Sequence, residues 1–238
     1  PTEPARPENN FQAQPKSYIY TEPAVLRANA NKFDAHDQFE NRANSLELCG
    51  HTIDKIELFI LGGTWSHYPK EYREQFIRDL YYAANTYNDN DNDTCQGNWY
   101  IVKRERLSLQ DEITINETAK SRIIGLTIET RPDCITKKEI IHLRQLGVTR
   151  IQIGVQHLDD DVLRHINRNC TYQDTVNAIR LWKKNCGKID IHIMPDLPGS
   201  DVQKDMDMFD EFLDCNTEIV KYTSNKQIVN IIILTLSL

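Results

Sequence analysis

Short apolar runs alternate with amphipathic segments along most of the chain. Apolar, β-branched runs predict strands at residues 56–61, 123–128, 150–155, 189–194 and 219–222. Apolar positions at helical spacing predict the intervening helices at 70–87, 136–146, 159–167, 171–186 and 202–213. We expect the strands to be apolar on both faces. This pattern predicts an α/β fold, a parallel sheet with helical crossovers buried on both sides. A part-barrel and a doubly wound sheet both fit it.

The flanking segments differ from this alternation. Residues 1–20 are rich in Pro, Asn and Gln and predict an extended lead-in, whereas residues 22–48 have apolar positions spaced for one or two helices. Residues 88–93 form a polar loop, and a polar, charged stretch follows to about residue 120. The apolar tail, Ile228 to Leu238, is too short to cross a bilayer.

Composition narrows the class of protein. The 238 residues are 39% hydrophobic and 26% charged, which is typical of a globular chain and excludes a disordered one. A net charge of −7 argues against nucleic-acid binding by bulk positive charge and leaves a local basic patch open. The six cysteines are scattered, with no CxxC or CxxxC pair, so they predict no ready metal site. Reduced thiols in the cytoplasm are the expectation.

Polar or glycine-bearing clusters follow four successive predicted strands, where ligands bind in parallel α/β folds. The clusters are Gly62-Gly63-Thr64, Glu129-Thr130-Arg131-Pro132, Gln156, and His192 with Pro195-Asp196-Leu197-Pro198-Gly199. Taken singly, each is typical of an ordinary turn, loop or cap. Their order and spacing favour a binding site.

The ordered set of motifs resembles the radical S-adenosylmethionine (SAM) domain of the Elongator catalytic subunit, a tRNA wobble-uridine modifying enzyme. The matching segments are KIELFILGGT, PKEYREQFIRDL, IGLTIETRPD, TRIQIGVQ and HIMPDLPG. The resemblance runs from about Ser17 to about Tyr222. It implies a partial (β/α) barrel over residues 21–222, after a lead-in at 1–20 and before a divergent tail at 223–238. The family's first strand and cluster loop have no counterpart in the chain.

The resemblance also implies site residues. Gly62, Gly63 and Thr64 would meet the methionyl amino end of SAM, and Glu129 would face that ligand. Gln156 would lie near the ribose, and Arg168 would pair with the SAM carboxylate. His192, on the next strand, would face the same binding site. The alternatives are ordinary ion pairs for Glu129 and Arg168 and a fully hydrogen-bonded core histidine for His192. Arg104 and Arg106 are candidates for tRNA contact.

The resemblance also implies that the reaction proceeds by free-radical chemistry. In the family, a [4Fe–4S] cluster on three cysteines reduces SAM to a 5′-deoxyadenosyl radical, and an acetyl group from acetyl-CoA becomes a carboxymethyl group on the wobble uridine. Residues 1–16 contain no cysteine, so we expect the cluster ligands upstream of Pro1 and the acetyltransferase domain outside this chain. Other Elongator-like subunits are expected partners. The alternatives are a non-catalytic remnant or tRNA-binding module, and a radical SAM enzyme with a small-molecule substrate.

Overall fold

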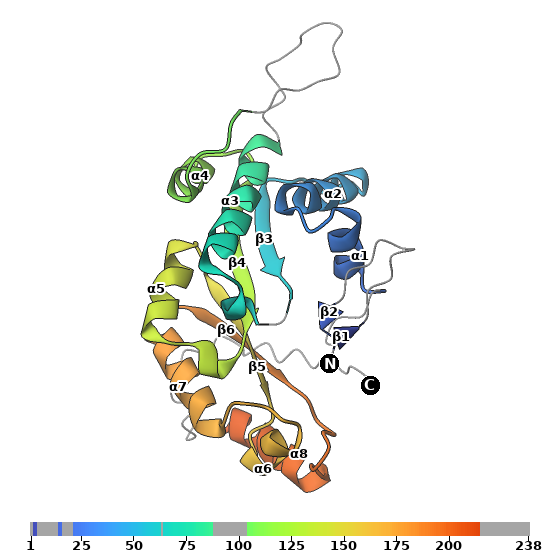
Figure 1. The fold of residues 1–238 in the computed structure, drawn as a ribbon, viewed down its shortest axis with the longest axis vertical. Coiled ribbons are helices and arrows are strands. Elements are labelled where there is room, and N and C mark those ends of the chain that lie inside the picture. Colours follow the sequence, from blue (N-terminus) through green and yellow to red (C-terminus); the bar gives the residue numbers. More distant parts are fainter. Residues whose placement is uncertain (1, 4–13, 16–20, 63, 88–103, 215–238) are drawn as a thin grey trace, which may run out of the picture. The chain divides into compact units, whose positions relative to one another are not determined.

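The computed structural model describes residues 2–3, 14–15, 21–62, 64–87 and 104–214 (Figure 1). These residues form two compact units, which are described separately. Unit 1 contains Pro1–Gly63 and His67–Leu126, and unit 2 contains Thr64–Ser66 and Thr127–Leu238. The predicted strand at 219–222, the loop at 88–93 and the apolar tail lie outside the described residues.

Unit 1 is mainly helical. Its elements are β1 (Thr2–Glu3), β2 (Gln14–Pro15), α1 (Pro23–Ala30), α2 (Ala35–Leu48), β3 (Lys55–Ile60), α3 (Lys70–Tyr87), α4 (Leu109–Asn116) and the first part of β4 (Arg122–Thr130). Residues 22–48, predicted to form one or two helices, form two, and the helix predicted at 70–87 is confirmed. Helix α4 was not predicted. It begins at Ser108, whose side chain accepts a hydrogen bond from the Asp111 N–H.

A buried carboxylate joins α4 to the rest of unit 1. Glu112 is 0% exposed, and its two oxygens lie 2.7 and 2.6 Å from the Arg104 guanidinium nitrogens. The Leu107 N–H and the Asn85 amide of α3 also donate to this carboxylate, at 3.0 and 2.9 Å. A buried charge is tolerated only when it is paired in this way. Polar contacts, rather than an apolar stripe, therefore fix α4 in place.

Unit 2 continues the alternation of strands and helices. After the end of β4 come the 3-10 turn η4 (Pro132–Cys134), α5 (Lys137–Gln145), β5 (Arg150–Gln156), α6 (Asp160–His165), α7 (Tyr172–Lys183), β6 (Lys188–Ile193) and α8 (Val202–Leu213). The strands are hydrogen-bonded in the order β3-β4-β5-β6, and both the β4–β5 and β5–β6 pairs are parallel. Helices α5 and α7 lie along the same side of β5 and β6 (Figure 1). The predicted parallel sheet with helical crossovers is confirmed.

The register of these strands corrects one expectation, because only one face of the sheet in unit 2 is apolar. Paired positions on that face are Ile128–Ile151–Ile189 and Thr130–Ile153–Ile191. The opposite face carries Thr127–Arg150–Lys188, Glu129–Gln152–Asp190 and Gly154–His192. Successive side chains of a strand point to opposite faces, so in-register strands collect their polar residues on one side. The expectation of two apolar faces was wrong.

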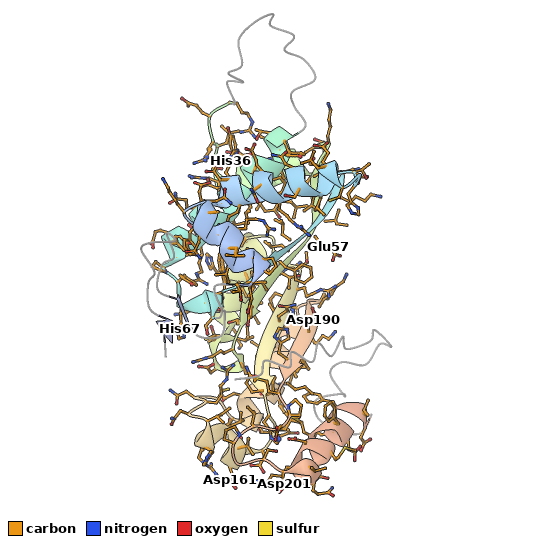
Figure 2. The ribbon with its side chains drawn as sticks, turned by 90° about the vertical axis from the view of Figure 1, so that its right-hand side faces the viewer. His36, Glu57, His67, Asp161, Asp190 and Asp201 are labelled. Atoms are coloured by element: carbon orange, nitrogen blue, oxygen red, sulfur yellow. The ribbon has the colours of Figure 1, made fainter. Side chains whose placement is uncertain are left out.

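This second face carries a buried aspartate that pairs with an arginine. Gln152 and Asp190 are 4% and 3% exposed. The Arg150 Nη1 atom lies 3.2 and 3.0 Å from the two carboxylate oxygens of Asp190, which Figure 2 labels on β6. This ion pair ties the beginnings of β5 and β6 together.

No helix among the described residues is long and apolar enough to span a membrane.

The buried carboxylate of unit 1 gives a stability prediction. Burial tends to raise the pKa of Glu112, but hydrogen bonds from Arg104, Leu107 and Asn85 outweigh it and hold the pKa below its usual range. We expect Glu112→Gln to lower the unfolding free energy by about 3 kcal/mol near neutral pH, because Arg104 loses its partner.

Chemical denaturation at several pH values measures this effect. A depressed carboxyl pKa stabilises the fold above the unfolded value of about 4.3, and this stabilisation is lost as pH falls through the folded pKa. The difference between wild type and Glu112→Gln should therefore shrink on acidification. A difference that stays constant as pH falls would show that the ionised carboxylate is not its source.

Candidate functional site

The end of β5 carries a β-bulge. Gly154 pairs with His192 and Gln156 pairs with Ile193, so Val155 is an extra residue in β5. Gln156 has a φ of +73°, in the left-handed region, and its carbonyl accepts a hydrogen bond from the Met194 N–H at 2.7 Å. The bulge places the Gln156 side chain beside Gly154, where a Cβ would lie 3.3 Å from Gln156 Nε2.

Arg168 reaches the same point from the segment after α6. Its Nη2 atom donates a hydrogen bond to the Gly154 carbonyl oxygen. A Cβ on Gly154 would lie only 2.8 Å from that nitrogen, so the missing side chain makes room for the guanidinium. Gly154 was not among the predicted site residues. A glycine inside a strand is the signal that could have found it, because it often marks a bulge or a close approach.

Three buried polar atoms around Gly154 have no hydrogen-bond partner within the described part of the chain. They are Gln156 Oε1, Arg168 Nε and His192 Nε2. Buried polar atoms are nearly always paired, so three in one place require an explanation. The set offers an acceptor, a donor and an imidazole nitrogen. A polar ligand with donor and acceptor groups of its own would complete it.

The end of β4 brings two more predicted residues to unit 2's sheet. Glu129 is half-buried and lies in the row of Gln152 and Asp190. Thr64 belongs to the short segment whose Ser66 hydroxyl lies 3.0 Å from the Thr130 hydroxyl. Five predicted site residues therefore lie in unit 2 at or beside the carboxyl ends of β4, β5 and β6: Thr64, Glu129, Gln156, Arg168 and His192.

The other predicted site residues lie elsewhere. Gly62 belongs to unit 1, and Gly63 lies outside the described residues. Arg104 pairs with the buried Glu112, and Arg106 Nε lies 3.7 Å from Asp79 Oδ1. Both guanidinium groups also lie over the Tyr82 ring, 5.2 and 5.4 Å from its centroid. Both arginines therefore make contacts within unit 1, and their contact with tRNA stays a prediction.

Cysteines do not gather among the described residues. Cys49, Cys134, Cys170 and Cys186 are free thiols, and burial raises the pKa of Cys134 and Cys170. Within the described ranges, the one group of three or more potential metal ligands is Asp34, His36 and Asp37, which contains no cysteine. An iron–sulfur cluster needs several thiolates close together. The described residues do not fit one.

Comparison with known proteins identifies relatives of the chain. It is 38% identical over 201 residues to the tRNA uridine(34) acetyltransferase of Methanocaldococcus infernus, covering 84% of this chain and 34% of that protein. It is 34% identical over 211 residues to Elongator complex protein 3 of Saccharomyces cerevisiae, covering 89% of this chain and 35% of that protein. The chain thus spans about a third of the length of these relatives.

The fold agrees with these relatives. A solved structure of the archaeal Elp3 of Methanocaldococcus infernus, with an N-terminal deletion, matches with a TM-score of 0.71 at 36% identity over 84% of this chain and 42% of that one. The model of the radical SAM superfamily matches residues 88–209, which is more than half of the chain. The chain therefore belongs to the radical SAM superfamily.

Proposed function

We propose that this chain is the SAM-binding core of an enzyme that modifies the wobble uridine of tRNA. The observation that carries the proposal is the set of three buried polar atoms around Gly154, at the carboxyl ends of parallel strands, that have no hydrogen-bond partner in the described part of the chain. The relatives named above support the reaction class, because their names specify tRNA uridine(34) acetyltransfer and Elongator. SAM supplies a carbon-centred radical on reductive cleavage.

The chemistry of SAM fits this set of atoms. Arg168 donates from one Nη to Gly154, which leaves its Nε–H for the SAM carboxylate. Gln156 Oε1 can accept a hydrogen bond from a ribose hydroxyl, and His192 Nε2 can bond to the same sugar. Glu129 supplies negative charge for the cationic amino and sulfonium groups, and Thr64 would meet the amino end.

The remaining components of the proposed enzyme lie beyond these residues. We place the ligands of the [4Fe–4S] cluster outside this chain, since the described cysteines do not gather. Transfer RNA is the proposed substrate, with Arg104 and Arg106 as candidate contacts. Acetyl-CoA would bind a further domain, and Elongator-like subunits are proposed partners. We also propose a cytoplasmic location.

Arg168 provides the direct test of the SAM site. We expect Arg168→Ala to weaken SAM binding by about 1.5–3 kcal/mol, or roughly tenfold to 150-fold, because a charge-assisted hydrogen bond is lost. Isothermal titration of the chain with SAM measures it. Arg164→Ala is the matched control, because that arginine is 71% exposed and pairs with Asp161 on α6. Equal affinities for the Arg168 variant and wild type would contradict the assignment.

Substitution of His192 should change the stability of the fold and the affinity for SAM in opposite directions. Its buried Nε2 lacks a partner among the described residues, which costs about 1–3 kcal/mol in an apolar setting. We expect His192→Leu to raise the unfolding free energy of the ligand-free chain by about 1 kcal/mol and to weaken SAM binding. Urea denaturation and titration measure the two effects. A less stable variant that binds SAM normally would show that His192 is an ordinary core residue.

A further inference from the structure

His157 directly follows the bulged Gln156 and is 1% exposed. Its Nδ1 atom accepts a hydrogen bond from the Asp159 N–H at 2.9 Å. Its Nε2 atom lies 3.3 Å from Asp205 Oδ1 and 3.3 Å from the Ser200 hydroxyl. The ring therefore connects the end of β5 with the segment that leads into α8.

These contacts fix the hydrogen positions. Because Nδ1 accepts a backbone N–H, the ring proton of neutral His157 resides on Nε2 and points to Asp205. The Ser200 hydroxyl donates to the same carboxylate oxygen at 2.6 Å. A hydrolytic triad has the reverse arrangement, in which the histidine accepts from serine at one nitrogen and donates to the acid from the other. The contacts among His157, Ser200 and Asp205 therefore hold loops in place and do not activate a nucleophile.

The Asp205 carboxylate also holds the loop after β6, which contains Pro195–Gly199. Its Oδ2 atom accepts a hydrogen bond from the Asp196 N–H at 2.8 Å, and Asp196 has a φ of +60°. Burial tends to raise the pKa of Asp205, but hydrogen bonds from Ser200, the Asp196 N–H and His157 outweigh it and keep the pKa low. The carboxylate is thus ionised near neutral pH, and its hydrogen bonds are charge-assisted.

A second connection runs alongside the first. The Lys204 ammonium lies 3.0 Å from Asp159 Oδ2 and 3.4 Å from the Gly199 carbonyl oxygen. Gly199 itself lies against His165 of α6, where a Cβ would come 3.3 Å from the ring carbon Cγ. Figure 2 shows Asp161 of α6 and Asp201, the N-cap of α8, at the same end of unit 2. The loops after β5 and β6 are therefore bound to each other at several points.

We propose that His157, Ser200 and Asp205 are positioning residues that hold the Pro195–Gly199 loop as one wall of the SAM site. The loop begins three residues after His192, and the Met194 N–H bonds to the Gln156 carbonyl, so it starts beside two of the atoms that have no partner among the described residues. Asp196 adopts a backbone conformation that non-glycine residues rarely hold without support. The carboxylate of Asp205 provides that support. This proposal rests on the proposed SAM function.

Asp205→Asn tests the positioning role without a change of shape. The amide removes the charge and directs a donor at groups that are themselves donors. We expect SAM binding by the chain to weaken about tenfold. Amide hydrogen exchange in residues 195–199 should speed up, while exchange in β5 stays slow. Glu112→Gln is the control, because it disrupts a buried carboxylate in unit 1 and should lower stability without changing SAM affinity.

A serine pair separates positioning from general loss of structure. Ser200→Ala removes one hydrogen bond and should weaken SAM binding severalfold, whereas Ser200→Thr keeps the hydroxyl and should restore it. If the Asp205 variant does not fold, the comparison of Ser200→Ala with Ser200→Thr still tests the proposal.

The outcomes distinguish the two proposals. SAM binding that weakens with Arg168→Ala but is unchanged by Ser200→Ala and Asp205→Asn overturns the positioning role and leaves the SAM site intact. A threonine variant that binds as weakly as the alanine variant also counts against positioning by the hydroxyl. A wild-type chain that does not bind SAM overturns both proposals.

Discussion

The in-register parallel pairing of β4, β5 and β6 determines the arrangement of unit 2. It places isoleucines from all three strands on one face and Arg150, Gln152 and Asp190 on the other. A slip of one residue in β5 would turn its isoleucines toward the polar face and its charged residues toward the apolar one. The apolar core and the candidate site therefore depend on the same register, and neither can change without the other.

The bulge at Val155 ends that register at the point where the site begins. It brings the Gln156 side chain beside Gly154, and the bare glycine admits the Arg168 guanidinium. The next residue, His157, is buried and bonded toward α8. The extra residue, Val155, thus positions both Gln156 at the candidate site and His157 at the connection between the loops after β5 and β6. Buried polar atoms without a partner among the described residues cost stability, and such costs are expected at functional sites.

Much of the fold could be predicted from the sequence, and the failures have physical causes. The predicted bounds of α3 and α8 agree with the structure because their apolar spacing is regular. Helix α4 was missed because a buried Glu112, rather than an apolar stripe, attaches it. The segments RIQIGVQ and KIDIHI alternate polar and apolar residues, which indicates one polar face. Two apolar faces were predicted because the isoleucines were considered without the polar residues between them. The contact between His157 and Asp205 joins residues 48 positions apart. Local sequence patterns do not predict how the loops between them fold, so this contact could not be predicted.

The most direct test is a crystal structure of the chain with S-adenosylhomocysteine, which carries the same carboxylate and ribose as SAM. We predict that the ligand carboxylate lies on Arg168 and the ribose within hydrogen-bond distance of Gln156 Oε1 or His192 Nε2. We also predict that Asp205 still holds the Pro195–Gly199 loop. A ligand bound elsewhere, or protein groups that satisfy Gln156 Oε1, Arg168 Nε and His192 Nε2 in the ligand-free crystal, would contradict the proposed site.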